Sequence, residues 1–465
     1  MKFKTKPYDH QLEAFKRSAR KESYALFMEQ GTGKTKVTID NCYWLFTADL
    51  INGIVIIAPN GVHTNWVIKE IPTHFLLPFV SYTYTSSKTK KQETAYAELL
   101  NEKKDFKVFA INIEALRTDR GYKQCEKFLK SNRCLVVVDE STVIKNPKAI
   151  QTKKAITLGS LAAFRRILSG TPTAQSPLDL YSQFQFLGHG LLPYNSYTVF
   201  KSQFALEEIV TMGNKQFRKI TGYKNIDKLT ADISPHSYRV TKKECLDLPD
   251  KIYQQIYVEM SKEQKKAYMQ LKEHAITMIE DKLLTAANAI TLMIKLHQIV
   301  CGNVYDDEGN VTRLPCPRLD TLKQILERTN GKVIIWAVFK EDIRRISEML
   351  GEKAVCYYGE IRNSDRELAI RAFQTDERIQ YFIANEAASR GLTLTSSSSS
   401  IYYSNSYKLE TRLQSEDRNH RIGQTESVTY TDLICRGTVD ERIIDALRGK
   451  KNLSDSILDN LGSII

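Results

Sequence analysis

The sequence predicts an α/β protein made of two doubly wound parallel-sheet lobes, with helical insertions between them. Two separate series of β-type runs, each alternating with helical patterns, predict two sheets. Some runs, such as residues 134–138, are apolar throughout, which is typical of strands buried on both faces of a parallel sheet. A chain of 465 residues and 53.3 kDa is long enough for two or three domains, each with its own core.

The first series lies in a predicted N-terminal lobe, residues 1–240, with a helical insertion near residues 188–235. Its strands are expected at residues 53–59, 107–113, 135–140 and 165–170. The second series lies in a predicted C-terminal lobe, residues 241–465, with a helical protrusion near residues 260–305. Its strands are expected at residues 332–339, 354–358, 379–385, 400–404 and 427–435.

A phosphate-loop pattern occupies residues 28–35 of the first lobe. Glycines at 31 and 33 allow backbone N–H groups to turn inward around a polyphosphate. Lys34 would reach the β- and γ-phosphates, and the Thr35 hydroxyl would complete a Mg²⁺ shell. The strict pattern has glycine where this chain has Met28. The segment after the loop can open a helix whose N-terminus favours an anion.

Two adjacent carboxylates, Asp139 and Glu140, end the apolar run at residues 135–140. Ligands of open α/β sheets bind at the carboxyl ends of the strands, so this position suits chemistry. Asp139 would hold Mg²⁺ through water, and Glu140 would orient the attacking water. The alternative is an acidic strand end that caps the next helix. The phosphate loop upstream favours hydrolysis over that alternative.

Near the C-terminus, residues 414–424 contain Arg418 and Arg421 in a polar segment. We expect the two residues one helical turn apart, so that both guanidinium groups point into one cleft and bind phosphate. A solvated surface helix is the alternative for such a pair alone. An arginine brought to a γ-phosphate accelerates its transfer about 10³–10⁵-fold. If these arginines arrive only when the lobes close, hydrolysis is coupled to lobe motion.

The composition indicates a basic protein with an ordinary globular content. Hydrophobic residues make up 42% of the chain. The formal net charge is +13, and such an excess of positive charge favours binding to polyanions, although charge alone is weak evidence for nucleic-acid binding. The eight cysteines form no Cys-x-x-Cys pair, which predicts neither a zinc site nor a disulfide framework and favours a reducing compartment. Residues 1–7 lack a following apolar core, so no signal peptide is expected. Residues 283–300 predict an amphipathic helix, not a membrane span.

These motifs in this order resemble those of superfamily 2 helicase-related ATPases, and within them the Swi/Snf-like family of double-stranded DNA translocases. The resemblance spans residues 7 to about 450 and implies two RecA-like lobes, ATP and Mg²⁺ as cofactors, and duplex DNA as partner. Residues 7–11 resemble the adenine-recognition segment, with Gln11 as the base-reading amide and Tyr8 as a stacking ring. Residues 29–35 resemble motif I, in which the family often has an acidic residue at position 28.

The remaining motifs follow in the family's order. Residues 139–146 resemble motif II, but Thr142 stands where the family usually has histidine. Residues 169–172 match motif III, and residues 238–251 resemble the basic crossover into the second lobe. Residues 389–394 occupy motif V, residues 414–424 match motif VI closely, and residues 438–443 follow as the family expects. At Ser404–Asn405 the chain departs from the family, which usually has an aspartate after the strand.

The resemblance assigns further roles to single residues. Gln414 joins Asp139, Glu140, Arg418 and Arg421 as catalytic. The nucleotide-binding residues it implies are Tyr8, Gln11, Gln30, Gly31, Thr32, Gly33, Lys34, Thr35 and Gly391. Thr35 and Asp139 would serve the metal, and Ser169, Gly170 and Thr171 would couple nucleotide state to the DNA track. The DNA candidates are Asn60, Asn65, Lys88, Lys90, Lys91, Asn112 and Lys145.

Two of these assignments have alternatives. The lysines at 88–91 could belong to a solvated loop, and Trp66, within the segment that resembles motif Ia, is favoured as a core residue over a base-stacking one. The expected function is ATP-driven translocation on duplex DNA without strand separation. The alternatives are a strand-separating or branch-migrating helicase, for which we identify no wedge or hairpin, a nucleotide-gated scaffold, and an RNA-acting ATPase. We expect a monomer without membrane contact, in the cytoplasm of a bacterial or virus-infected cell, with the nucleus as the alternative.

Overall fold

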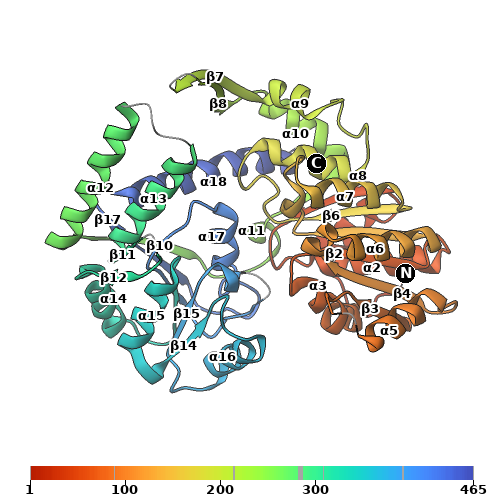
Figure 1. The fold of residues 1–465 in the computed structure, drawn as a ribbon. Coiled ribbons are helices and arrows are strands. Elements are labelled where there is room, and N and C mark those ends of the chain that lie inside the picture. Colours follow the sequence, from red (N-terminus) through yellow and green to blue (C-terminus); the bar gives the residue numbers. More distant parts are fainter. Residues whose placement is uncertain are drawn as a thin grey trace. The chain divides into compact units, whose positions relative to one another are not determined.

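The computed structural model describes all residues except 1, 88, 213–214, 281–285, 307, 390–391 and 464–465. By their contacts the residues form two compact units, and Figure 1 colours the chain from red at its start to blue at its end. The first unit comprises Met1–Glu207, Ile220–Asp247 and Asn452–Ile465. The second comprises Glu208–Lys219 and Leu248–Lys451. The main division therefore falls at residue 247, seven residues after the end of the predicted N-terminal lobe.

A seven-stranded sheet forms the centre of the first unit, in the order β3-β4-β2-β5-β6-β1-β9. Every neighbouring pair in it is parallel. Its strands are β1 (Ser23–Met28), β2 (Gly53–Ala58), β3 (Phe79–Thr83), β4 (Phe106–Asn112), β5 (Cys134–Asp139), β6 (Phe164–Leu168) and β9 (Ser237–Val240). The four strands predicted from the sequence in this lobe are confirmed.

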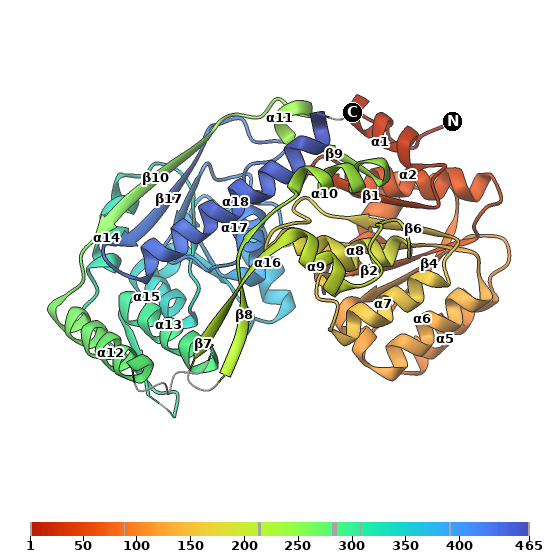
Figure 2. The same cartoon turned by 90° about the horizontal axis from the view of Figure 1, so that it is seen from above.

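Alternation along the strands supplies a core on each face of this sheet. On β2, Ile54 and Ile56 pack in one apolar cluster, and Val55 and Ile57 pack in the other. Helices cover both faces, as Figure 2 shows. They are α1 (Asp9–Ser18), α2 (Lys34–Thr47), α3 (Val62–Asn65), α4 (Ile71–His74), α5 (Lys90–Asn101), α6 (Asp119–Ser131), α7 (Ile150–Ser160), α8 (Leu180–Leu187), α9 (Tyr197–Phe204), α10 (Ile226–Ile233) and α11 (Lys242–Cys245).

The second unit has a six-stranded sheet, in the order β10-β17-β16-β13-β15-β14, whose neighbouring pairs are all parallel. Its strands are β10 (Lys251–Val258), β13 (Val333–Trp336), β14 (Ala354–Tyr357), β15 (Tyr381–Ala384), β16 (Ser399–Tyr402) and β17 (Val428–Cys435). The five strands predicted in this lobe are confirmed. Together the two parallel sheets confirm the predicted fold class.

Helices of the second unit also lie on both faces of its sheet. The clusters that contain Ile335 and Ile334 occupy opposite faces of β13. The helices are α12 (Lys262–Glu280), α13 (Ala286–Val300), α14 (Pro317–Arg328), α15 (Lys340–Leu350), α16 (Asn363–Thr375), α17 (Leu409–Glu416) and the part of α18 (Val439–Ser463) that ends at Lys451, since the rest of α18 belongs to the first unit. Helices α12 and α13 lie in the range of the predicted protrusion, and a small sheet of β11 (Asn303–Tyr305) and β12 (Val311–Arg313) follows them.

The insertion near residues 188–235 is only partly helical. Between α9 and α10 the chain forms a two-stranded sheet of β7 (Ala205–Met212) and β8 (Lys215–Tyr223). β-Branched and aromatic residues are common in both segments, which favours strands over a helix. The expectation of a helical insertion is therefore wrong for residues 205–212 and 215–223.

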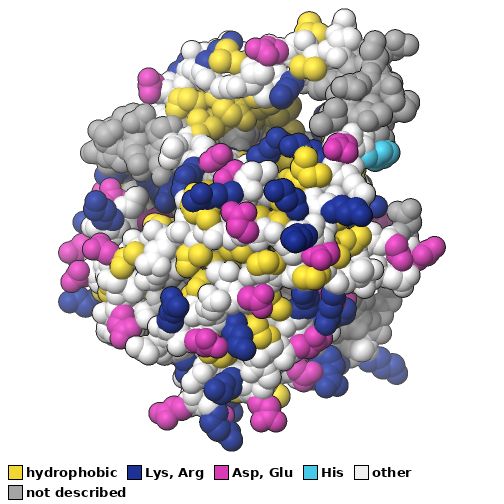
Figure 3. Space-filling view, turned by 90° about the vertical axis from the view of Figure 1, so that its left-hand side faces the viewer, with side chains coloured by type: hydrophobic (Ala, Val, Ile, Leu, Met, Phe, Trp, Pro, Cys, Tyr) yellow, Lys and Arg dark blue, Asp and Glu magenta, His cyan; other side chains and the backbone are white. Residues whose placement is uncertain are grey.

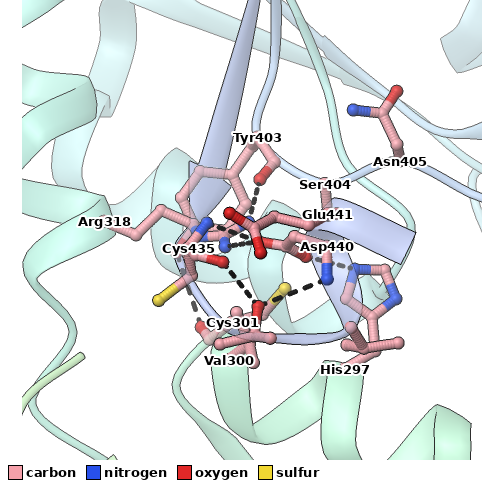
Figure 4. Close-up of polar contacts among 12 residues, drawn as sticks. His297, Val300, Cys301, Arg318, Tyr403, Ser404, Asn405, Cys435, Asp440 and Glu441 are labelled. Atoms are coloured by element: carbon pink, nitrogen blue, oxygen red, sulfur yellow. Dashed lines mark hydrogen bonds and ion pairs between the residues drawn. The ribbon is translucent and has the colours of Figure 1, made fainter. Parts of the chain in front are cut away.

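A buried ion pair between Arg318 and Asp440 joins three elements of the second unit (Figure 4). Arg318, on α14, also donates to the backbone carbonyl of Tyr403, at 2.6 Å, just after β16. The Asp440 carboxylate accepts the backbone N–H of Cys435 at 2.9 Å and so fixes the first turn of α18 after β17. His297 lies 3.5 Å from Asp440, but burial lowers the pKa of its imidazole to about 4. The segment at residues 438–443 thus has a structural role.

Basic and acidic side chains are interspersed on the face of the molecule that Figure 3 shows. The basic excess of the chain is therefore not gathered on that face. All eight cysteines are unbonded thiols. Among the described residues, no helix is long and apolar enough to cross a membrane.

Replacing Asp440 with alanine should strongly destabilise the second unit. The change leaves the Arg318 guanidinium buried without its carboxylate, and breaking a buried pair in this way costs about 3–5 kcal/mol. Thermal and urea unfolding of D440A would measure the loss. D445A, an exposed aspartate on the same helix, is the control and should stay within about 0.5 kcal/mol of the parent protein. Equal stability of D440A and D445A would contradict the assignment.

Candidate nucleotide-binding and hydrolysis site

The loops after β1, β5 and β6 meet at the carboxyl edge of the first sheet, because these strands lie in the adjacent order β5-β6-β1. Gly170, after β6, packs directly on the phosphate loop. A Cβ added there would lie 3.2 Å from the backbone nitrogen of Gln30. The structure thus brings the predicted motifs I, II and III together within one unit.

Two glycines give the phosphate loop its shape. Gly31 and Gly33 have φ values of 84° and 96°, in the left-handed region that side chains disfavour. Gly33 also has no space for a side chain, since a Cβ would lie 2.2 Å from the Gln11 amide nitrogen. Gln30 and Thr35 flank these residues on the loop and at the start of α2, each partly exposed.

Lys34 points into the loop that precedes it. Its ammonium group donates to the carbonyl oxygens of Met28, at 2.9 Å, and Glu29, at 3.3 Å. Thr32 is buried and donates its hydroxyl to the same Glu29 carbonyl, at 2.7 Å. A phosphate oxygen carries a full charge and is a stronger acceptor for an ammonium group than a backbone carbonyl. The lysine is therefore placed to exchange these carbonyls for a polyphosphate.

The predicted adenine-recognition segment is bonded to this loop. The Gln11 side chain accepts the Tyr8 backbone N–H and donates to the Thr32 carbonyl, both at 3.1 Å. The His10 ring also bonds that carbonyl, at 2.8 Å, and stacks on the Tyr8 ring. Tyr8 is 55% exposed, so one face of its ring is open for a base. Sequence reasoning missed His10, because no pattern distinguished it from a surface histidine.

The two carboxylates after β5 are buried and held differently. Asp139 accepts the Trp66 indole N–H at 2.8 Å and the Glu140 backbone N–H at 2.9 Å. Burial raises the pKa of Asp139, while the hydrogen bond from Trp66 and the positive charge of Lys34 oppose the rise. Glu140 has φ of 50°, a strained value for a non-glycine residue and one often found at active sites. Trp66 is a core residue, as favoured, but it also orients the predicted metal carboxylate.

Gln183 on α8 connects motif II to motif III. Its amide accepts the Ser141 hydroxyl at 2.6 Å and donates to the Pro172 carbonyl at 2.9 Å. Ser169 is fully buried, and its hydroxyl accepts the Thr171 backbone N–H at 3.1 Å. Sequence reasoning missed Gln183, since nothing in a helical segment distinguishes a bridging amide from a surface one. Thr142, which replaces the family's histidine, is buried beside the Glu140 carbonyl.

In the second unit, the two predicted arginines lie beyond α17, which ends at Glu416. The expectation that one helix carries both is wrong, because the chain leaves the helix through Asp417, whose ψ is 1°. The two guanidinium groups nonetheless converge. Arg418 and Arg421 both donate to the Leu392 carbonyl, at 2.8 and 3.1 Å. Gln414 is buried on α17 and donates to Glu410 at 3.2 Å.

A buried charge network supports the segment that carries these arginines. Arg412 pairs with Asp432 and with Glu416, and Glu416 also accepts Lys251 and the Tyr253 hydroxyl. Burial alone would raise the pKa of Glu416. The opposite charges of Lys251 and Arg412 outweigh burial and lower this pKa to about 2.

The departure from the family at residue 405 fits this network. The Asn405 amide donates to the Asp432 carboxylate and accepts from Arg412, both at 2.8 Å. An aspartate at 405 would place a second carboxylate against Asp432. The asparagine instead satisfies both charged neighbours.

Those predicted DNA-contact residues that the structure describes lie at the same carboxyl edge of the first sheet. Asn60 and Asn65 follow β2, and Asn112 is the last residue of β4. The Asn65 and Asn112 amides donate to Glu70 and Glu114. Lys145 follows β5 and lies 4.0 Å from Asp179. Lys90 and Lys91 are exposed at the start of α5. Lys88 and Gly391 lie outside the described residues.

The sequence matches two families, described as SNF2-related domain over residues 11–304 and Helicase conserved C-terminal domain over residues 317–423. It is 27% identical, over 91% of its length, to an uncharacterised ATP-dependent helicase of Mycoplasma genitalium, covering 39% of that protein. It is 24% identical, over 93% of its length, to the chromodomain-helicase-DNA-binding protein 1-like of Danio rerio, covering 41% of that protein. The chain thus spans about two fifths of the length of these relatives.

Among solved structures, the chain is similar to the Sulfolobus solfataricus SWI2/SNF2 ATPase core in complex with dsDNA. The identity is 26% and the TM-score 0.44, and the match covers 98% of this chain and 93% of the other.

The Glu416 network should make stability depend on pH in acid. A carboxyl group whose pKa falls from 4.5 to about 2 on folding stabilises the protein above pH 4.5 and loses that contribution as the pH falls toward 2. The loss is about 1.4 kcal/mol per pH unit within this window. Unfolding of E416Q, followed at intervals from pH 6 to 3, should therefore show a flatter pH dependence than the parent protein. E426Q, at an exposed glutamate, should keep the parent slope, and an unchanged slope in E416Q would contradict the network's role.

Proposed function

We infer that this chain is an ATP hydrolase that translocates along double-stranded DNA, because it belongs to the SNF2-related domain family. In this role it would remodel DNA or protein–DNA complexes. The second family match, to a helicase C-terminal domain, falls entirely within the second unit. The presence of both matched domains in one chain favours a translocating enzyme over a binding module.

The observation that carries the proposal is the position of Lys34 within the glycine loop after β1, near Asp139 and Glu140 at the end of β5, which is separated from β1 only by β6. A nucleotide-gated scaffold has no use for a strained, buried Glu140 next to a phosphate loop, whereas hydrolysis requires an acid that orients water. In the proposed mechanism Lys34 binds the β- and γ-phosphates, Gln11 reads the adenine, and the Tyr8 ring stacks on it.

The residues at the loop suit Mg²⁺. Mg²⁺ prefers oxygen ligands and takes only one or two from protein, completing its shell with phosphates and water. Thr35 offers a hydroxyl at the start of α2, and Asp139 offers a carboxylate held in place by Trp66. Because burial raises the pKa of Asp139, a nearby cation would help to keep that carboxylate ionised. Bound Mg²⁺ would neutralise charge on the phosphates.

Arg418 and Arg421 complete the proposed mechanism from the second unit. Their shared acceptor, the Leu392 carbonyl, holds both guanidinium groups at one point, so they can exchange it for the γ-phosphate oxygens together. Gln414 would assist them, and the family resemblance assigns Gly391 to the nucleotide as well. Hydrolysis then requires the two units to close on the nucleotide, which couples turnover to movement.

Duplex DNA would bind along the carboxyl edge of the first sheet through backbone phosphates. Ser169, Gly170 and Thr171 would relay nucleotide state to that track, since Gly170 already touches the phosphate loop. We propose the chain acts as a monomer in the cytoplasm of a bacterial or virus-infected cell. The unbonded cysteines and the bacterial relative support this location.

Strand separation is the second candidate function. It needs an element that can part a duplex, and the two-stranded sheet β7–β8 is such an element in form. Leu206 and Ile209 on β7 are 46% and 67% exposed, which would let them stack on an opened base pair. Displacement of a triplex-forming strand tests translocation, and opening of a forked duplex tests separation. Unwinding without triplex displacement would overturn the first function in favour of the second.

The most informative single measurement is ATP turnover with duplex DNA, single-stranded DNA, forked DNA and RNA. Duplex translocation predicts the highest stimulation by duplex. Stimulation by RNA alone would show that the chain acts on RNA instead of duplex DNA. Turnover without any response to nucleic acid would overturn the proposal.

Substitutions of the proposed catalytic residues should separate binding from turnover. E140Q and R421A should lower turnover by at least about 10³-fold while a fluorescent ATP analogue still binds, because neither residue is needed to hold the triphosphate. K34A should instead weaken analogue binding itself. Normal hydrolysis by R421A would show that the arginine assignment is wrong.

Salt dependence should report the phosphate contacts of Lys90 and Lys91. Each lysine that neutralises a phosphate contributes about −0.9 to the slope of log affinity against log salt, so the double variant K90A/K91A should flatten this slope by about 2. Filter binding to duplex DNA between 50 and 200 mM salt would measure it. K103A/K104A, which removes two exposed lysines before β4, is the matched control. An unchanged slope in K90A/K91A would favour the solvated-loop alternative.

A further inference from the structure

The strand by which the chain leaves the first unit lies against the strand that precedes the phosphate loop. β9 pairs in parallel with β1, with Val240 opposite Met28. One residue further, the Glu29 backbone N–H donates to the Val240 carbonyl at 2.9 Å. After β9 the chain forms α11, and the larger segment of the second unit begins at Leu248. The start of the phosphate loop and the start of the crossover therefore share one hydrogen-bonded ladder.

The Glu29 side chain adds a bond from the loop to the crossover. Its carboxylate accepts the backbone N–H of Lys242, the first residue of α11. The Lys242 side chain is buried and lies over the loop, since its Cε would be 3.9 Å from a Cβ at Gly31. Glu29 is also one of the two residues whose carbonyls hold the Lys34 ammonium group. One residue thus contacts both the phosphate-binding lysine and the crossover.

Arg239 on β9 makes a second set of connections. Its guanidinium group donates to the Phe27 carbonyl at 3.1 Å and to the Gly170 carbonyl at 3.3 Å. The first acceptor is on the strand before the phosphate loop, and the second is in the turn that packs on Gln30. Because the buried Arg239 guanidinium group is bonded to both segments, a movement of either segment would disturb its hydrogen bonds.

Helix α11 does not need Glu29 to begin. Thr241 and Glu244 form a capping box, in which Thr241 accepts the Glu244 N–H and the Glu244 carboxylate accepts the Thr241 N–H. The bond from Lys242 to Glu29 is therefore additional to the ordinary cap. This separates a role in starting α11, which belongs to Glu244, from a role in tying α11 to the loop.

We propose that Glu29 and Arg239 are positioning residues that transmit phosphate binding to the crossover between the two units. The inference rests on the proposed function, since it presumes that the loop binds a nucleotide. When Lys34 exchanges the carbonyls of Met28 and Glu29 for phosphate, the segment that anchors Lys242 loses that restraint. The crossover then moves with the phosphate loop, to which Glu29 connects it. Through Arg239 it also moves with the turn at Gly170.

Limited proteolysis tests this without DNA. Trypsin can cut after the exposed Lys243, which follows the anchored residue directly, and the rate can be followed by mass spectrometry. In the parent protein a non-hydrolysable ATP analogue should change cleavage at this site at least threefold. In E29A the analogue should bind within threefold of the parent affinity, but cleavage should no longer respond. E29Q keeps a carbonyl acceptor and should restore part of the response.

E244A is the matched control, because it loosens the cap of α11 and leaves the Glu29 bond intact. It should keep the nucleotide response even if basal cleavage rises. A full response in E29A would overturn the proposal. So would a tenfold loss of analogue affinity in E29A, since Glu29 would then be a binding residue and not a positioning one.

Turnover measurements distinguish this proposal from the function on which it rests. R239K and R239Q should keep the KM for ATP and lose at least about tenfold of the stimulation by duplex DNA, with thermal unfolding to check folding. If duplex DNA does not stimulate the parent protein, the translocase function fails, while the protease response still decides the role of Glu29. Normal stimulation in both Arg239 variants would remove Arg239 from the proposal.

Discussion

The position of β1 between β6 and β9 is the constraint on which the first unit depends. Whatever follows β1 is flanked by the turn after β6 on one side and by the chain's exit from the unit on the other. Gly170 and Val240 both reach the phosphate loop for this reason. A parallel sheet sends all these segments to one edge, so strand order alone brings the lysine, the carboxylates and the crossover together. The side chains then refine an arrangement that the backbone already imposes.

The two units position their functional residues by different physical means. In the first, glycines and backbone carbonyls shape the site, and Trp66 orients Asp139 from the core. In the second, the arginine segment follows a helix anchored by Arg412, Glu416 and Asp432, all buried. Such a network specifies one geometry only while every partner is present. Asn405 illustrates this, since the amide satisfies a carboxylate and a guanidinium group that an aspartate would not satisfy together.

The sequence predicted most of the fold because its central strands are continuous apolar runs. All nine strands expected from such runs are present, whereas β10 was missed because much of it is exposed and polar, and only its pairing with β17 makes it a strand. The strand β1 was also missed, although its apolar segment directly precedes the glycine loop. The β7–β8 sheet was missed because strands that pair only with each other leave no buried run in the sequence.

The candidate site was less predictable, because its connections are made by residues without a local signal. Gly31, Gly33 and Lys34 are recognisable by spacing, and the structure gives each a physical reason. His10, Gln183 and Arg239 have no such spacing, since their partners lie 22, 42 and 212 residues away. Tertiary hydrogen bonds of this kind depend on the fold and cannot be read from sequence neighbours. The helical placement of Arg418 and Arg421 failed for a related reason, because α17 ends at Glu416, two residues before the first arginine.

The cations of the two units differ in the acceptors that they contact. Arg318, Arg412 and Lys251 pair with buried carboxylates, and breaking such a pair costs several kcal/mol. Lys34, Arg418 and Arg421 donate to backbone carbonyls, and a hydrogen bond made by a charged group contributes about 1.5–3 kcal/mol. A phosphate oxygen can displace such a carbonyl, because the new bond joins two charged groups and is stronger. The carbonyl bonds of the cations assigned to the nucleotide can thus be exchanged for phosphate, whereas the carboxylate pairs of Arg318, Arg412 and Lys251 hold the scaffold around them.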